Sequence, residues 1–391
     1  MRSDRTISFC GVLPASFIAL AACVTAAVAQ TYDLRVLHRF TGPPDDGVVA
    51  TTGVQFDSAG NLYGATNNGG AFDGGTIYKI AEDGTETILH SFEPLDEFGD
   101  IVDPNNIVVD ASTGDIYGST RLGGDLCCGH NGGGQLYKLA ADGTFTVLHS
   151  FGSDSEDAYP SGLIRDAQGN LYGTTTNGGA YGDGTIFEYA TDGTYKVLYA
   201  FGKFSGSNPM GSLIRDEAGN LYGVTHFAPG GESCGTIYRL APNGTFTNLH
   251  RFKGLGPNDG CNPTSLAADQ AGNFYGTTFS TVFKFTSDGT LTTLHQFTFG
   301  VHFVHGNNPV LPVNGTLYGT AYGLLNVPSG VLYKIAPDGT YGELYQLGHG
   351  SGNFPQGRLT LKTGRLYGAT GYGHGGPTGN GTVFSVGVAA Q

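Results

Sequence analysis

Residues 60–80 read GNLYGATNNGGAFDGGTIYKI, two short apolar runs on either side of a glycine-rich loop. A Tyr-Gly pair after an apolar residue, as in Tyr63-Gly64, recurs along the chain. The tyrosines of these pairs are Tyr63, Tyr117, Tyr172, Tyr222, Tyr275, Tyr318 and Tyr367. Successive tyrosines are 43 to 55 residues apart. A period near this length indicates a repeat architecture, and this interpretation takes precedence over any motif search.

Each repeat predicts four β-strands. In one copy these are SGLIRDA (161–167), NLYGTT (170–175), GTIFEYA (184–190) and TYKVLYAF (194–201). Alternating apolar residues and aromatic or β-branched content support each strand. Short Ala-Gly-Asn and Asp-Gly-Thr links favour tight antiparallel hairpins. Four-stranded antiparallel units repeated around an axis are typical of the blades of a propeller.

The two ends of the chain predict how the ring closes. The last third strand, GTVFSVG (381–387), has no fourth strand after it, whereas YDLRVLHRF (32–40) resembles the fourth strand TFTVLHSF (144–151). We therefore expect the N-terminal strand to complete the last blade, which hides two sheet edges. The prediction is an all-β, seven-bladed β-propeller with four antiparallel strands per blade, forming one domain over residues 30–391.

Composition limits the classes of partner. The chain has 391 residues, 66 of them glycine, and a formal net charge of −14. This acidity excludes a typical nucleic-acid-binding protein, which needs a basic surface, and it disfavours anionic membranes. We expect a monomer that binds no nucleic acid and inserts into no membrane.

The N-terminal residues predict export. Arg2 and Arg5 precede an apolar run over residues 7–22, and Ala27-Val28-Ala29 has the form of a signal-peptidase site. We expect residues 1–29 to be a signal peptide and the mature protein to be secreted or periplasmic. The alternative is a lipoprotein, because Leu20-Ala21-Ala22-Cys23 resembles a lipobox and would anchor the chain through Cys23.

The full repeat, roughly P-x-G-x-L-x-x-D-x-x-G-N-L-Y-G-T-T-x-x-G-G…G-T-I-Y-K-L-x-x-D-G-T-x-T-V-L-H-S-F, resembles the GloVer tandem-repeat family. The resemblance implies an exported bacterial protein that is β-propeller-like and carries one of several surface anchors. It implies no catalytic residues. No C-terminal anchor is visible after the last repeat, so Cys23 is the one candidate anchor.

The histidines fall into two groups, one at a position that the repeats share and one at positions that vary between repeats. Five occupy the same place in the fourth strand and are expected to be structural: His38, His90, His149, His250 and His295. Six others are aperiodic and fall in the longer loops: His130, His226, His302, His305, His349 and His374. In a propeller, the links between second and third strands and between blades lie on one face, here called the loop face. The tight hairpins lie on the opposite face, here called the turn face.

The variable residues predict that ligands bind on the loop face. After Tyr-Gly-x-Thr the next residue differs from copy to copy, and the sixth copy departs from the pattern with Ala321-Tyr322. Candidate ligand-binding residues are Asn67, Arg121, His130, His226, Phe279, His302, His305, Tyr322, His349, Tyr372 and His374. The fifth copy lacks its glycine-rich loop. This loss predicts either a notch beside Phe279, His302 and His305 or simple erosion of a loop.

Cysteines and possible metal ligands give weaker signals. Cys234 and Cys261 fall in neighbouring loops of the loop face, and we expect a disulfide between them, as suits an exported protein. Adjacent Cys127 and Cys128 form either a vicinal disulfide or two thiols. We expect no cofactor. Structural zinc or calcium are the alternatives, based on the residues His302, His305, His349 and His374 for zinc, and Asp73, Asp125 and Asp183 for calcium.

Two functions remain open. The first is an exported binding module for a glycan or a surface protein, with Tyr322 and Tyr372 able to stack on sugars. The second is an extracellular polysaccharide lyase or hydrolase with an axial cleft. Its site would contain a tyrosine or histidine base, drawn from His226, Tyr322 and His374, and Arg121 to neutralise a uronate carboxylate. No nucleophile elbow, P-loop or HExxH motif favours catalysis.

Overall fold

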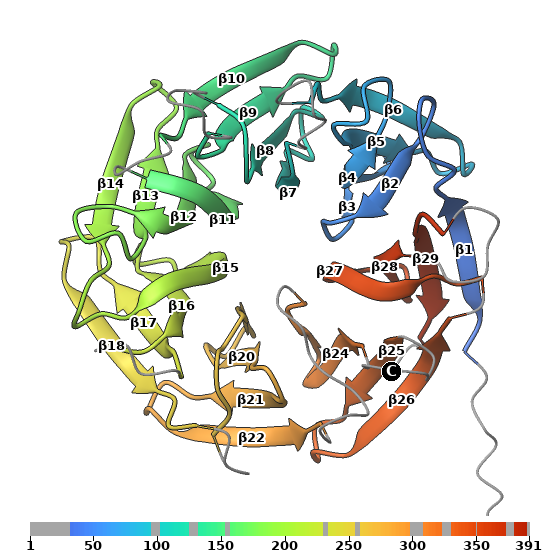
Figure 1. Ribbon diagram of the computed structural model, residues 1–391. Helices are drawn as coiled ribbons and strands as arrows, with labels where there is room; N and C mark the ends of the chain where they lie inside the picture. Colours follow the sequence, from blue (N-terminus) through green and yellow to red (C-terminus); the bar gives the residue numbers. More distant parts are fainter. Residues whose placement is uncertain are drawn as a thin grey trace, which may run out of the picture. The chain divides into compact units, whose positions relative to one another are not determined.

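The protein forms a ring of seven β-sheets around a central axis, shown by the computed structural model (Figure 1). The structure describes residues 32–94, 102–124, 132–152, 157–229, 234–254, 259–297, 308–322, 330–348, 350–372 and 379–388. Residues Tyr32–Gln391 make up one compact unit. In the described residues the secondary structure is entirely β, so the all-β propeller prediction is confirmed. No helix long and apolar enough to cross a membrane occurs among them.

The first four blades follow the repeat in chain order. Blade one contains β2 (Gly47–Ala50), β3 (Gln55–Phe56), β4 (Leu62–Gly69), β5 (Thr76–Ile80) and β6 (Glu86–Ser91). Blade two contains β7 (Pro104–Val109), β8 (Ile116–Thr120), β9 (Gln135–Leu139) and β10 (Phe145–Ser150). Blade three contains β11 (Asp157–Arg165), β12 (Leu171–Gly178), β13 (Thr185–Tyr189) and β14 (Tyr195–Ala200). Blade four contains β15 (Ser207–Arg215), β16 (Leu221–Phe227), β17 (Thr236–Leu240) and β18 (Phe246–Arg251).

The last three blades bring the chain back to its start. Blade five contains β19 (Ser265–Ala268), β20 (Phe274–Thr277), β21 (Thr281–Phe285) and β22 (Leu291–Gln296). Blade six contains β23 (Leu311–Val313), β24 (Thr316–Ala321), β25 (Gly330–Ile335) and β26 (Tyr341–Leu347). Blade seven contains β27 (Asn353–Lys362), β28 (Arg365–Tyr372), β29 (Thr382–Gly387) and, from the N-terminus, β1 (Leu34–Arg39).

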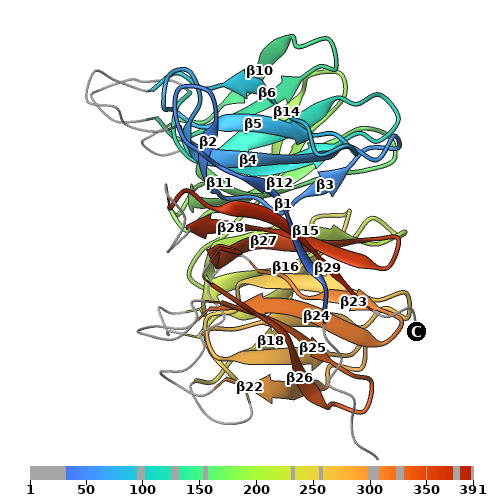
Figure 2. The same cartoon turned by 90° about the vertical axis from the view of Figure 1, so that its right-hand side faces the viewer.

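The N-terminal strand closes the ring, as the sequence predicted. Strand β1 pairs antiparallel with β29, in a register that runs from Leu34 opposite Val386 to Arg39 opposite Thr382. Blade one differs from the four-strand prediction in one detail, because its innermost strand is split into β2 and β3, which both pair with β4. In Figure 2 the short hairpins point to one side of the ring and the longer links to the other, which separates the turn face from the loop face.

The glycine of each Tyr-Gly pair lies under an aromatic ring from the third strand of its own blade. In blade two, a Cβ on Gly118 would lie 2.2 Å from the Oη of Tyr137. That tyrosine is fully buried, as are the aromatic residues at the same position in the other blades: Tyr78, Phe187, Tyr238, Phe283, Tyr333 and Phe384. The repeat therefore keeps glycine here because no other residue leaves room for the ring.

The tyrosine of each pair also has a structural role in several blades. The Tyr63 hydroxyl donates to Asp57 Oδ2 at 2.9 Å, and Asn61 donates to the same carboxylate through its backbone and side-chain nitrogens. Equivalent tyrosines bond to Asp216 and Asp269. Burial, together with the bond to Asp57, raises the pKa of Tyr63 to about 12, so the hydroxyl remains a donor at neutral pH. The motif Asp-x-x-Gly-Asn-Leu-Tyr thus encodes a hairpin and the hydrogen bond that fixes it.

Candidate functional site

The shared histidines of the outer strands, which the repeat predicted to be structural, pack between neighbouring blades. The ring of His149 stacks on Tyr195 of the next blade, with centroids 3.8 Å apart and planes 6° from parallel. His250 Nε2 lies 2.9 Å from Asp259 Oδ1 in the link to the next blade, and His38 pairs with Asp46 in the same way at 3.0 Å. These contacts hold neighbouring blades together and leave the shared histidines buried or half-buried.

We expect His149 to make the fold sensitive to acid. Burial lowers the pKa of His149 below its ordinary value of 6.5, so the folded protein keeps the ring neutral. As the pH falls through 6.5, the unfolded chain takes up the proton first. The contribution to stability is therefore complete above that pH and decreases below it. The variant His149→Tyr, which copies Tyr199 of blade three, should lose less stability between about pH 7.5 and about pH 5 in urea titrations. An equal loss in both proteins would contradict the prediction.

On the loop face, two variable positions in each blade form what we call the rim. The first lies at the end of the second strand or directly after it and contains the predicted residues Asn67, Arg121, His226, Phe279 and Tyr322, and in blade seven Tyr372, one residue further along. The second, near the start of the innermost strand, was not anticipated. In six blades it holds a non-glycine residue with left-handed backbone: Val49 (φ 60°), Asp103 (56°), Tyr159 (61°), Asn208 (51°), Asn262 (56°) and Phe354 (53°). Such conformations cost free energy and concentrate at functional sites.

The rim of blades one to three is polar. Arg121 Nη1 lies 4.0 Å from Asp103 Oδ2, and Asn67 of blade one hydrogen-bonds to the same carboxyl. Burial raises the pKa of Asp103, while the charge of Arg121 and the bond from Asn67 oppose that rise. Arg121 also lies 5.9 Å from the ring centre of Tyr159 in blade three. Its side chain is 62% exposed and can therefore reach a ligand.

The rim of blades six and seven is aromatic. Tyr322 and Phe354 have ring centres 5.1 Å apart, and Phe354 and Tyr372 have ring centres 5.7 Å apart. Tyr372 is 52% exposed, which is unusual for a large aromatic residue. The Val49 amide donates to the Asn380 carbonyl at 3.0 Å, so blade seven joins blade one at this edge. The aromatic group and the polar group therefore occupy one continuous arc of the rim.

The rim of blades four and five is cross-linked. Cys234 and Cys261 form a disulfide, which confirms the predicted pair. Asn262 donates through Nδ2 to the His226 carbonyl at 3.0 Å, and the Phe279 amide donates to the Cys261 carbonyl at 3.0 Å. His226 and Phe279 are both half-buried. These contacts hold the two residues in this part of the rim, away from the arc of blades six, seven, one, two and three.

Several predicted residues lie outside the described part of the chain. They are His130, His302, His305, His349 and His374, with Cys127, Cys128 and Asp125. Of the predicted calcium ligands that are described, Asp73 accepts the Gly69 amide at 2.8 Å and so caps its own loop. Among the described residues, no group of three potential metal ligands includes Asp73 or Asp183.

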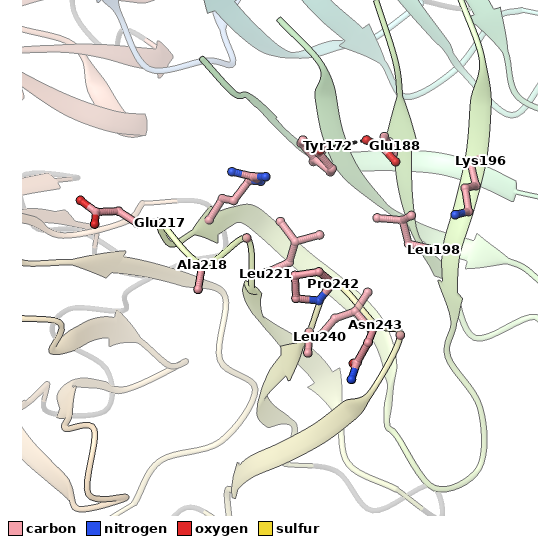
Figure 3. A pocket seen from close by; sticks show the side chains of 14 residues that line it. Tyr172, Glu188, Lys196, Leu198, Glu217, Ala218, Leu221, Leu240, Pro242 and Asn243 are labelled. Atoms are coloured by element: carbon pink, nitrogen blue, oxygen red, sulfur yellow. Dashed lines mark hydrogen bonds between the residues drawn. The ribbon is translucent and has the colours of Figure 1, made fainter. Parts of the chain in front are cut away.

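The turn face holds a cavity that the sequence did not predict. It has a volume of about 540 Å³ and lies between blades three and four (Figure 3). Tyr172 donates to Glu188 at 2.8 Å in its wall, and Arg215 lies 5.4 Å from the Tyr172 ring centre. Glu188 stands where the other blades have Lys79, Lys138, Arg239, Lys284, Lys334 and Ser385. Lys196 is the cross-strand partner of Glu188, and its positive charge compensates for the negative charge that Glu188 brings to this position. The acidic residue at this position in one repeat was the feature of the sequence that could have indicated the cavity.

The repeat matches that of a known protein family. Residues 103–297, from the start of blade two to the end of blade five, match the model of the Gloeobacter/Verrucomicrobia repeat. The chain belongs to this repeat family. Blades one, six and seven lie outside the matched segment but share its Tyr-Gly pair and its strand order. No curated protein matches the sequence.

Solved structures share the propeller fold with this member of the repeat family. The extracellular domain of a putative one-component system from B. thetaiotaomicron has 12% identity and a TM-score of 0.56, over 93% of this chain and 40% of that one. PorZ, a surface component of the type-IX secretion system of Porphyromonas gingivalis, has 15% identity and a TM-score of 0.52, over 85% and 46%. A gluconolactonase from Xanthomonas campestris has 17% identity and a TM-score of 0.47, over 92% and 90%. At these identities the first two show the fold alone, and the third supports no functional conclusion.

Proposed function

We propose that the protein is an exported binding propeller and that its ligand is a glycan bound at the rim of the loop face. The observation that carries this proposal is the arc that runs from blade six through blade seven to blade three. It presents Tyr322, Phe354 and Tyr372 at one end and an Asn67–Asp103–Arg121 network at the other. The scaffold beneath it repeats from blade to blade, whereas these residues do not.

The chemistry of the arc suits a sugar chain. Sugars present apolar C–H faces that pack on aromatic rings, and hydroxyl groups that need donors and acceptors. A carboxylate, an amide and a guanidinium supply both kinds of partner at one place. The rim residues are fixed by backbone hydrogen bonds and contacts between blades, so binding needs little ordering of the protein. A shallow rim also fits an extended chain better than a small molecule that requires enclosure.

Export is supported by independent features. The disulfide between Cys234 and Cys261 suits an oxidising compartment. Residues 1–29 have the pattern of a signal peptide, and a lipid anchor through Cys23 is the alternative form of attachment. Two of the similar structures are an extracellular domain and a bacterial surface component. We infer a monomer that is secreted, periplasmic or held at the surface, with a glycan or a glycan-bearing surface protein as its partner.

Catalysis by a polysaccharide lyase or hydrolase is the second candidate, and one observation disfavours Tyr322, one of its three proposed bases. Burial raises the pKa of Tyr322 to about 12, whereas a general base at neutral pH needs a lower value. Arg121 contacts Asp103 and Tyr159 in the polar half of the arc, and Tyr322 packs with Phe354 in the aromatic half. We therefore place binding ahead of catalysis.

The proposal predicts that Arg121→Ala and Tyr372→Ala each weaken glycan binding. Loss of a hydrogen bond from a charged group costs about 1.5–3 kcal/mol, which is roughly a tenfold to hundredfold increase in Kd. Loss of an aromatic stacking partner costs about 0.5–1.5 kcal/mol, so Tyr372→Ala should raise Kd by roughly two- to tenfold. Isothermal titration calorimetry with glycans selected from a panel of neutral and uronate oligosaccharides measures both effects.

The control is Phe204→Ala. Phe204 is 84% exposed and lies in the link between blades three and four, so it tests whether any exposed aromatic residue binds sugars. It should leave Kd unchanged. The same incubations are assayed for new reducing ends and for unsaturated uronate ends, which would establish catalysis instead. Equal binding by the wild type, Arg121→Ala and Tyr372→Ala would contradict the rim as the site.

A further inference from the structure

The seam between blades seven and one has a carboxylate at a position where the other blades have an aromatic residue or a leucine. At four other seams, a ring from one outer strand stacks on a ring that begins the next outer strand. These pairs are His90 with Phe145, His149 with Tyr195, Tyr199 with Phe246, and His295 with Tyr341. At the position equivalent to Phe145, blade five has Leu291 and blade seven has Leu34. Blade one has Glu86, which faces His38 across the seam where the ring closes.

Glu86 brings a second carboxylate into an existing histidine–aspartate pair. One ligand atom each from His38, Asp46 and Glu86 can be chosen so that all three lie within 4.8 Å of one another. Asp46 is held through both oxygens. Its Oδ2 accepts from His38 Nε2 at 3.0 Å, from the Thr41 amide at 2.7 Å and from the Thr41 hydroxyl at 3.1 Å, whereas its Oδ1 accepts one bond, from the Gly47 amide at 2.6 Å, and keeps a lone pair for a cation. Glu86 Oε1 is inaccessible to solvent and has no hydrogen-bond partner among the residues that the structure describes.

This arrangement is costly as it stands. Two carboxylates lie close together, Asp46 buried and Glu86 half-buried, and in the described part of the chain neither one pairs with a lysine or arginine. The equivalent seam between blades four and five shows what the scaffold alone requires. There His250 pairs with Asp259, and Leu291 fills the place of Glu86. The histidine–aspartate pair is therefore part of the repeated frame, and Glu86 is the addition that needs an explanation.

We propose that His38, Asp46 and Glu86 form a binding site for a divalent transition-metal ion of the Zn²⁺ class. Imidazole nitrogen and carboxylate oxygen both bind Zn²⁺, and three protein ligands make a zinc site with an open position, whereas Ca²⁺ takes six to eight oxygen ligands. A divalent cation would neutralise both carboxylates and would give Glu86 Oε1 a partner. The site would also join three segments that meet at the closure: β1, the link that follows it, and β6. The ion would thus cross-link blades seven and one where the ring closes, at a site separate from the rim.

The first test measures Zn²⁺ binding and thermal unfolding with the full chain, purified without a polyhistidine tag and treated with a chelator. Zn²⁺ should raise the Tm of the wild type by several degrees, because a ligand that binds only the folded state stabilises it. The variant Glu86→Leu copies Leu291 and should bind Zn²⁺ at least about 100-fold more weakly. Wild-type protein that gains no stability from Zn²⁺, or a Glu86→Leu variant with unchanged Zn²⁺ affinity, would overturn the proposal.

The second test works even if Glu86→Leu unfolds. Co²⁺ can replace Zn²⁺, and its visible absorption reports ligation by nitrogen and oxygen at low coordination number. We expect this absorption in the wild type and its loss in His38→Gln, which keeps a polar side chain next to Asp46. Conversely, Leu291→Glu adds the missing carboxylate beside His250 and Asp259 and should increase the number of bound ions by one. Identical Co²⁺ spectra for the wild type and His38→Gln would assign any bound metal to another site and reject this one.

Discussion

A chain that lacks residues 32–40 is expected not to fold. These residues include β1, the outer strand of blade seven, and Phe40, which is 1% exposed and packs edge-on against Tyr78 with ring centres 5.2 Å apart. Truncation of one such buried phenylalanine to alanine costs about 3–5 kcal/mol. The deletion also uncovers the edge of β29 and removes the pairing of His38 with Asp46. Since whole domains have only about 5–15 kcal/mol of stability, this loss should be decisive.

Circular dichroism and thermal unfolding of the deleted chain measure the effect. The matched control keeps the same residues but moves them, so that residues 32–41 follow Val388 through an Asp-Gly turn like the other third-to-fourth-strand hairpins. This permuted chain should recover cooperative unfolding, because β1 then reaches β29 as a hairpin partner. A deleted chain that melts cooperatively within a few degrees of the wild type would show that the ring does not depend on its shared blade.

The fold was predictable because a repeat provides its own internal comparison. Seven copies of the Tyr-Gly pair gave the number of blades, and the unpaired strand at each end gave the closure. The pairing of Cys234 with Cys261 followed from placing each cysteine within its repeat. The split of the innermost strand of blade one into β2 and β3 was not predicted, since the pattern of apolar residues there resembles that of a single strand.

The candidate sites were less predictable, because their contacts join different blades. Asn67 and Asp103 belong to different repeats, and neither residue indicates its partner in the sequence. The left-handed backbone of Tyr159 and Phe354 is also hidden, since these residue types rarely adopt it. Glu86 and Glu188 differ in this respect. Both are visible in the sequence as departures from the repeat, but they lie on an outer strand and in the wall of a turn-face cavity, away from the loop face where ligand binding was predicted.

The glycine of the Tyr-Gly pair is needed for the packing of each blade. We expect Gly118→Ala to destabilise the fold by about 3 kcal/mol or more. The added Cβ would lie 2.2 Å from both Cζ and Oη of Tyr137, a fully buried ring that the surrounding blades hold in place. Chemical denaturation measures the loss. Gly152→Ala is the control, because a Cβ there has no other atom within 4 Å.

A double-mutant cycle identifies the cause of the expected loss. Tyr137→Leu removes the ring and is itself destabilising, but it vacates the space that the new methyl group needs. The Tyr137 hydroxyl has no hydrogen-bond partner within the described part of the chain, so its removal leaves no polar group there unpaired. Gly118→Ala should therefore cost much less in the Tyr137→Leu background, with a coupling energy of about 1–3 kcal/mol. Additive effects would mean that the glycine serves the backbone and not the ring. The Tyr-Gly pair would then reflect strand geometry, and the packing explanation of the whole repeat would fail.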